Sequence, residues 1–126
     1  MSALAEPPGP AAAVLVAFSA VDKGGRIADR GFVAALGWLP GARLHIRERR
    51  GTVVVTRTGD GVHQLSDRGF LHLPLPVRRW WRLGAGDRVL LTADRGGGVL
   101  VVHPPAVLGT LVAGAHAAAV DGGAAA

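Results

Sequence analysis

The chain has 126 residues, enough for one small domain or two very small ones. It carries 14 Lys and Arg against 9 Asp and Glu, a net charge of +5, which suits an anionic partner such as a nucleic acid, although GC-rich coding also raises the arginine content. It has no cysteine, which excludes disulfides, thiolate metal sites and a thiol nucleophile and is compatible with a reducing cytoplasm.

The N-terminal stretch, residues 1–13, is rich in Pro, Ala and Gly, lacks periodicity and is expected to be a disordered lead-in. The apolar run over residues 11–20 lacks the basic flank of a signal peptide and is too short to span a bilayer, so no membrane partner is expected. Residues 14–21 form a β-capable run, which predicts the opening strand of a first unit.

Two similar units make up most of the chain. The first, residues 14–58, is expected to continue with a turn, a short strand, a short helix and a hairpin: Asp22–Gly25, Arg26–Ile27, Phe32–Trp38, and Arg43–Glu48 with Thr52–Thr56. After a short joint, the second, residues 62–105, repeats the order of strand, helix and hairpin: Phe70–Leu73, Val77–Leu83, and Arg88–Ala93 with Val99–His103. The Ala- and Gly-rich tail, residues 106–126, is expected to hold a weak helix over residues 107–120 and a disordered end.

The two units align along their length. Gly25 falls on Gly69, 44 residues further on, and Gly41 falls on Gly86, 45 residues further on. A unit of this size leaves too much apolar surface in water to be stable by itself, so each copy is expected to pack on the other. The pattern predicts a mainly β fold with short helices, an α+β class.

The second unit carries the most specific pattern in the chain. The string G-x-L-x-L-P-x-x-V-R-R-x-x-x-L-x-x-G-D-R-V runs from Gly69 to Val89, with Pro74 ending the strand and Pro76 in the first turn of the helix. On these residues the chain resembles the SpoVT/AbrB/MazE family of bacterial DNA-binding proteins. The resemblance implies that the two copies interlock their hairpins into one small swapped-hairpin barrel. The first copy lacks the proline that ends the strand, which puts its local geometry in question.

The resemblance also implies that basic residues on loops and short helices contact DNA. One such position, the Arg of a Gly-Arg step, is Arg26 in the first copy and Phe70 in the second. The other, an Arg pair at the helix start, is Arg78 and Arg79 in the second copy and is apolar in the first. Either the two copies share one asymmetric DNA-binding face, or each has lost half of its contacts and tight DNA binding with them.

Further cations are weaker candidates for the same role. Four of them lie on the loops and helices around these positions: Lys23, Arg68, Arg30 and Arg82. The alternative for all of the cations is a solvated, charged surface. For Trp80 and Trp81 the alternatives are a place in the core and, less favoured, base stacking.

No catalytic or metal site is predicted. The histidines show neither the spacing of metal ligands nor acidic partners: His45, His63, His72, His103 and His116. No serine lies in a nucleophile motif, and no glycine-rich loop matches a phosphate-binding fingerprint. We therefore expect neither an enzyme nor a cofactor.

The sequence thus predicts a cytoplasmic, nucleoid-associated transcriptional regulator that binds double-stranded DNA. The alternative is an antitoxin-like module that holds a toxin partner, but family antitoxins end in an acidic tail, whereas Asp121 is the only acid in the last twenty residues here. The repeated pattern is compatible both with an intrachain pseudo-dimer and with a homodimer.

Overall fold

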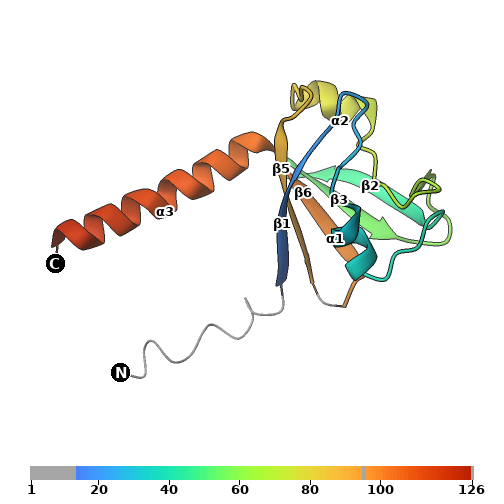
Figure 1. Cartoon of the computed structure of the whole chain (residues 1–126), viewed down its shortest axis with the longest axis horizontal. Coiled ribbons are helices and arrows are strands. Elements are labelled where there is room, and N and C mark those ends of the chain that lie inside the picture. Colours follow the sequence, from blue (N-terminus) through green and yellow to red (C-terminus); the bar gives the residue numbers. More distant parts are fainter. Residues whose placement is uncertain (1–13, 95, 126) are drawn as a thin grey trace.

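The computed structural model describes residues 14–94 and 96–125, which form a six-stranded antiparallel sheet with three helices (Figure 1). The elements in chain order are β1 (Val14–Ala20), α1 (Arg30–Ala35), β2 (Arg43–Arg49), β3 (Thr52–Arg57), β4 (His63–Gln64), α2 (Leu75–Trp80), β5 (Arg88–Asp94), β6 (Val99–His103) and α3 (Pro105–Ala125). The predicted α+β class is confirmed. The expected lead-in, residues 1–13, lies outside the described residues.

Strands of the two copies are interleaved in the sheet, whose order is β1-β5-β6-β3-β2-β4. β1, from the first copy, pairs with β5 of the second, with Val14 opposite Asp94 and Ala20 opposite Arg88. β4, from the second copy, pairs with β2 of the first. The two hairpins meet where β3 pairs with β6. Each copy therefore places its leading strand on the hairpin of the other.

The sheet is not a closed barrel, contrary to the closed form that we expected. β1 and β4 stand at its opposite ends, and no pairing joins them within the described part of the chain. The physical reason is the length of β4, since two residues provide too short an edge to close a sheet against the seven residues of β1.

The core lies on one face of the sheet and is completed by both copies. The inward residues of β3, β5 and β6 are fully buried, as alternation requires of strands with one covered face. α1 adds Phe32 and Val33 to this core. The buried indole of Trp38 donates from Nε1 to the carbonyl oxygen of Gly97 at 2.6 Å, and so ties the tip of the second hairpin to the first copy. Burial of each large side chain contributes about 1.5–3 kcal/mol.

Two strands that we predicted are not formed. At residues 26–27 and 70–73 the described chain has only isolated bridges, one of which joins Arg26 to His72. The prediction was wrong because the two segments pair over very few residues where they cross. A helix begins soon after each crossing segment, which leaves no length for a strand. On one side Asp29 caps α1 by accepting the N–H of Phe32, and on the other Pro74 caps α2.

Both short helices begin and end earlier than predicted. Each ends just before a residue with positive φ, Gly37 at +80° after α1 and Arg82 at +53° after α2, which are equivalent positions of the two copies. The Arg pair therefore lies in the last turn of α2 and not at its start, which corrects the expectation for Arg78 and Arg79.

The C-terminal helix α3 leaves the sheet and projects away from it (Figure 1). It is longer at both ends than the predicted helix over residues 107–120. In the part of the chain that the structure describes, no helix is both long and apolar enough to cross a membrane.

Candidate nucleic-acid interface

Two equivalent turns, one from each copy, build the end of the molecule where the predicted cations lie. In the first, the N–H groups of Gly24 and Arg26 donate to Oδ1 of Asp22 at 2.9 and 2.8 Å. In the second, the N–H of Phe70 donates to Oγ of Ser66 at 3.0 Å. Each turn closes through a glycine at positive φ, Gly25 in the first turn and Gly69 in the second. The alignment of the two copies places these glycines at equivalent positions.

The segments after these turns cross and bind each other. The N–H of Ile27 donates to the carbonyl oxygen of Leu71 at 2.9 Å, and the N–H of Leu73 donates to that of Gly25 at 2.8 Å. Ile27 and Leu71 are both buried beneath the crossing. Since backbone hydrogen bonds and core side chains fix both segments, the cations that they carry are held on a rigid base.

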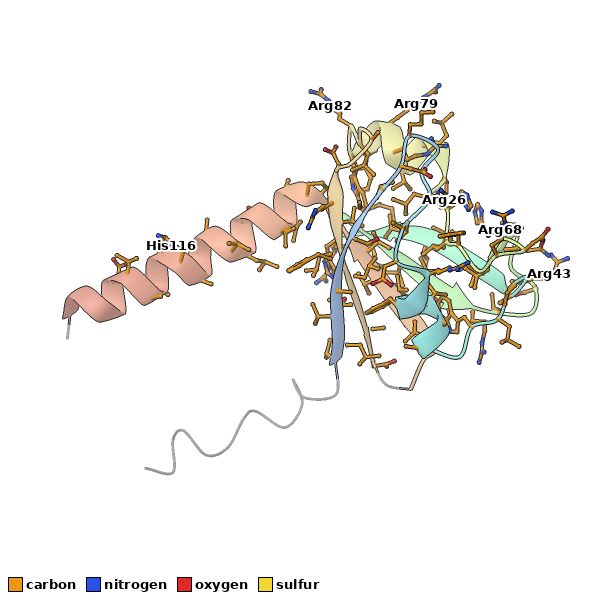
Figure 2. The ribbon with its side chains drawn as sticks, in the orientation of Figure 1. Arg26, Arg43, Arg68, Arg79, Arg82 and His116 are labelled. Carbon is orange, nitrogen blue, oxygen red and sulfur yellow. The ribbon has the colours of Figure 1, made fainter. Side chains whose placement is uncertain are left out.

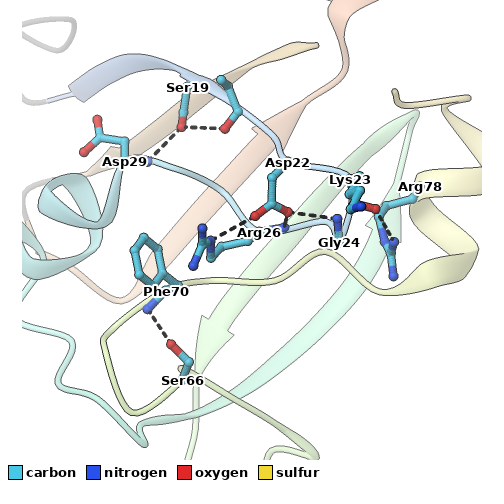
Figure 3. Close-up of polar contacts among 10 residues, drawn as sticks. Ser19, Asp22, Lys23, Gly24, Arg26, Asp29, Ser66, Phe70 and Arg78 are labelled. Atoms are coloured by element: carbon cyan, nitrogen blue, oxygen red, sulfur yellow. Dashed lines mark hydrogen bonds and ion pairs between the residues drawn. The ribbon is translucent and has the colours of Figure 1, made fainter. Parts of the chain in front are cut away.

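Phe70 forms the centre of a first group of cations, of which Figure 3 shows Arg26. The guanidinium carbon of Arg26 lies 4.5 Å from the centroid of the Phe70 ring, and that of Arg30 lies 5.3 Å from it. Arg30 also donates to the backbone carbonyl of Arg68 at 3.3 Å. We call Arg26, Arg30, Arg68 and Phe70 the Phe70 cluster. Most of it lines a shallow pocket of about 420 Å³, together with Ser66, Asp67 and His72.

Asp22 offsets part of the charge of this cluster. Its carboxylate lies 3.0 Å from Nε of Arg26, and both side chains are more than 40% exposed, at 43% and 45%. The backbone N–H of Arg26, with smaller contributions from the N–H of Gly24 and the Arg26 charge, holds the pKa of Asp22 below its ordinary value. An exposed pair of this kind adds little stability, so its main effect is on local charge.

A second group of cations lies around α2. Lys23, Arg79 and Arg82 are exposed, and with Arg78 they line a groove of about 300 Å³ between α2 and the turn of the first copy. We call these four residues the α2 cluster. Figure 2 shows Arg79 and Arg82 pointing outward at the top of the molecule, with Arg26 below them on the right. Among the described residues, no ion pair engages a cation of this cluster.

Arg78 differs from the rest of the α2 cluster because its guanidinium binds backbone. Nε donates to the carbonyl oxygen of Leu73 at 3.1 Å, and Nη1 donates to that of Lys23 at 3.3 Å. The side chain is half-buried. Arg78 therefore holds the turn of the first copy against α2 of the second, and it is a positioning residue more than a free cation.

The two tryptophans beside this cluster divide between the core and the surface. Trp81 is half-buried against the hydrophobic core, whereas Trp80 is 52% exposed and stacks on it, with ring centroids 6.1 Å apart. Trp80 thus presents an aromatic surface next to Arg79.

All seven predicted cations belong to one of these two clusters, which adjoin at Asp22, Lys23 and Arg26. Sequence reasoning missed the roles of Asp22 and Phe70. The alignment could have indicated the contact between Phe70 and Arg26, because it places them at equivalent positions of the two copies. Equivalent residues next to the point where the two segments cross come into contact.

This arrangement can bind anions. Exposed guanidinium groups suit phosphate oxygens and the edges of guanine, and exposed aromatic rings suit bases. Within residues 14–94 and 96–125, no group of three or more His, Asp and Glu side chains is arranged to hold a metal ion.

Comparison with protein families, curated protein sequences and solved structures finds no match for this chain.

Proposed function

We propose that this chain is a bacterial transcriptional regulator that binds duplex DNA through the Phe70 and α2 clusters, in the cytoplasm and on the nucleoid, and that it is a binding protein with no catalytic role. The observation that carries the proposal is the joining of the cations of both copies on one rigid end of the molecule. Arg26 comes from the first copy and Arg79 from the second, and they flank the same turn. This arrangement supports one asymmetric DNA-binding face shared by both copies over the alternative that each copy has lost half of its DNA contacts.

We assign the chain to the SpoVT/AbrB/MazE swapped-hairpin type, as a tandem pair within one chain. The exchange of leading strands between the copies, β1 onto β5 and β4 onto β2, supports this assignment. So does the docking of Trp38 of the first copy on Gly97 in the second hairpin. An intrachain pair of this kind presents its two sets of cations as one unit.

The roles of the individual cations follow from their present partners. Lys23, Arg79 and Arg82 are exposed, form no ion pair with another described residue, and are assigned to phosphates. Arg26 and Arg30 lie over the ring of Phe70, and Nε of Arg26 and Nη1 of Arg30 already have protein partners. Their remaining N–H groups are assigned to phosphate or to guanine.

The test is a titration of the purified chain against DNA from around its own gene and against an unrelated duplex, at two or more salt concentrations. We expect tighter binding to the first DNA, persisting at the higher salt. If about four of these cations neutralise phosphates, log K falls with log salt with a slope of about −4. Equal, weak binding to both duplexes that vanishes with added salt would contradict sequence recognition.

A matched variant sharpens this test. Arg79→Ala removes a free cation of the α2 cluster, whereas Arg50→Ala removes an exposed cation at the tip of the first hairpin. Both lower the net charge by the same amount. Weaker binding and a shallower salt slope for Arg79→Ala alone would tie DNA to the proposed face. Equal losses would mean that net charge, and not this face, attracts the DNA.

The antitoxin-like alternative retains one observation, the exposed apolar surface of α3.

A further inference from the structure

The outer face of the sheet, opposite the core, is apolar and uncovered along β1. Val14, Val16 and Phe18 alternate outward and are 43%, 59% and 55% exposed. The face continues onto the neighbouring strands, since Val16 lies opposite Thr92, and Thr92 lies opposite Val101. One-sided burial is usual for an antiparallel sheet, but the solvated side is then normally polar. The exposed apolar side chains of β1, which lie beside Thr92 and Asp94 on the same face, mark an interaction surface.

α3 is the second uncovered apolar surface. Leu111, Val112 and Val120 are 55%, 58% and 53% exposed, and Asp121 is the only charged residue of the helix. A helix that is apolar on all sides is normally buried. The helix also contains four glycines, each of which costs about 1 kcal/mol relative to alanine, so it depends on packing for its stability.

The chain's own α3 contacts β5 but does not cover the exposed side chains along β1. The helix follows β6 through Pro104 and Pro105, whose φ angles are fixed by their rings. The N–H groups of Val107 and Leu108 donate to the carbonyl oxygen of Pro104 at 3.1 and 3.3 Å, which fixes the first turn of the helix to the buried Pro104. From this anchored start the helix runs away from the sheet, as Figure 1 shows.

We propose that a second copy of this chain covers both surfaces, with α3 of each copy lying across the outer face of β1, β5 and β6 of the other. The contact is reciprocal, so it closes as a two-fold dimer and does not propagate into a filament. One chain supplies both halves of the interface, an unpartnered helix and an unpartnered sheet face, next to each other. This inference is independent of DNA binding.

The available area is sufficient for a stable dimer. A helix of 21 residues is about 31 Å long. Laid on a sheet at a width of about 10 Å it covers roughly 300 Å², and counting both surfaces in two reciprocal contacts removes on the order of 1,200 Å² from solvent. That value lies at the lower end of the range for specific, stable interfaces.

Charge also favours this interface over others. Each chain carries a net charge of +5, so two copies repel wherever their basic clusters approach. The outer face and α3 carry few charges, and in Figure 2 α3 with His116 extends away from the side of the molecule that carries Arg26 and Arg68. A dimer formed through α3 therefore leaves both copies' basic clusters free.

The oligomeric state of the full chain tests the proposal, measured by sedimentation equilibrium from about 1 to 100 μM. We expect a species of twice the 12.9 kDa chain mass, stable to added salt because the interface is apolar. Leu111→Glu on α3 and Val16→Glu on β1 are each expected to shift the dimer to monomer by raising the dissociation constant at least tenfold.

Two controls make the same chemical changes elsewhere. Leu39→Glu and Val62→Glu alter residues that are 72% and 81% exposed but lie outside both surfaces, and they should leave the dimer intact. All four changes are at exposed positions, and circular dichroism verifies that each variant is folded. A monomeric wild type, or a dimer that Leu111→Glu and Val16→Glu leave unaffected, would overturn the proposal. Monomers that co-sediment with vesicles of anionic phospholipid would overturn it in favour of a membrane surface.

Discussion

The side chain of Arg78 occupies the space above Gly25 that any larger residue there would need. A Cβ atom on Gly25 would lie 2.5 Å from both Cδ and Nε of Arg78 and 2.9 Å from the carbonyl oxygen of Leu73. Gly25 belongs to the first copy, and Arg78 and Leu73 belong to the second. The contact between the copies is therefore as close as packing inside a core, although it lies near the surface.

Gly25→Ala and Gly69→Ala form a matched pair of stability variants. Both glycines have φ near +80°, at 84° and 82°, so alanine costs about 1 kcal/mol at either position from backbone conformation alone. Only at Gly25 does the new methyl group also meet other atoms, since the nearest atom at Gly69 is Cγ of Pro40 at 3.8 Å. We expect Gly25→Ala to lower the free energy of unfolding by at least about 2 kcal/mol more than Gly69→Ala, measured by urea denaturation. Equal losses would show that Arg78 yields without cost.

Arg78→Ala and Arg79→Ala should separate stability from DNA binding. Arg78→Ala removes donors from the carbonyl oxygens of Leu73 and Lys23, and we expect it to cost about 1–3 kcal/mol of stability. Arg79→Ala should leave the urea midpoint unchanged and weaken DNA binding, with a reduction of the salt slope by about 1. A destabilised Arg79→Ala variant would contradict this division of roles.

Asp22→Ser should tighten DNA binding. Serine is the natural residue at the equivalent position, where Ser66 closes its turn by accepting the N–H of Phe70, so it should preserve the turn of the first copy. The change removes a carboxylate that pairs with Arg26 and would repel phosphate. We expect an increase in affinity of several fold at low salt that diminishes as salt is added, measured by fluorescence anisotropy. Asp67→Ser, which removes another exposed acid near the Phe70 cluster, is the comparison for a charge effect alone. Weaker binding by Asp22→Ser would contradict the prediction.

Arg82→Gly should raise stability while lowering DNA affinity. Arg82 has φ of +53°, a conformation that costs a non-glycine residue about 1 kcal/mol, and the first copy has Gly37 at this position. The substitution relieves that cost and removes a free cation of the α2 cluster. Opposite shifts in the urea midpoint and in the DNA dissociation constant are expected. A gain in stability without loss of affinity would exclude Arg82 from the interface.

His103 should make stability fall in mild acid. Burial lowers the pKa of this half-buried imidazole, whose Nε2 lies 3.0 Å from Oγ1 of Thr92. As pH falls below about 6.5, the unfolded chain binds a proton at His103 before the folded chain does, so folding is penalised in acid and unaffected above about pH 7. His103→Gln should remove this part of the pH dependence between pH 7.5 and 5, measured by urea denaturation at a series of pH values. An unchanged pH profile for His103→Gln would contradict the prediction.

The hairpins could be predicted from the sequence nearly to the residue. Their alternating side chains and turn residues are local signals, and β2, β5 and β6 begin at the predicted positions. The pairing of β1 with β5 could not be predicted from local signals, because strand partners depend on contacts across the whole chain. β4 was missed because two residues carry no measurable alternation.

The candidate site could be predicted as a set of cations but not as an arrangement. The alignment showed that Arg26 and the pair of Arg78 and Arg79 are divided between the two copies, and the structure places both around the turn of the first copy. The alignment could not show that Arg78 binds the backbone of Leu73, since this contact depends on where α2 begins. The contact of Arg26 with Phe70 likewise arises only when the two copies cross.

The pairing of β1 with β5 also determines when the protein can fold during synthesis. Ala20 lies opposite Arg88 and Val14 opposite Asp94, so more than half of the chain must be made between one strand and its partner. The first copy therefore leaves the ribosome before its partner strand has been made. Its hydrophobic side chains stay exposed to solvent until β5 emerges. Contacts of such high sequence separation fold slowly. Because both strands belong to one chain, this step needs no second molecule, but it cannot occur before β5 has been made.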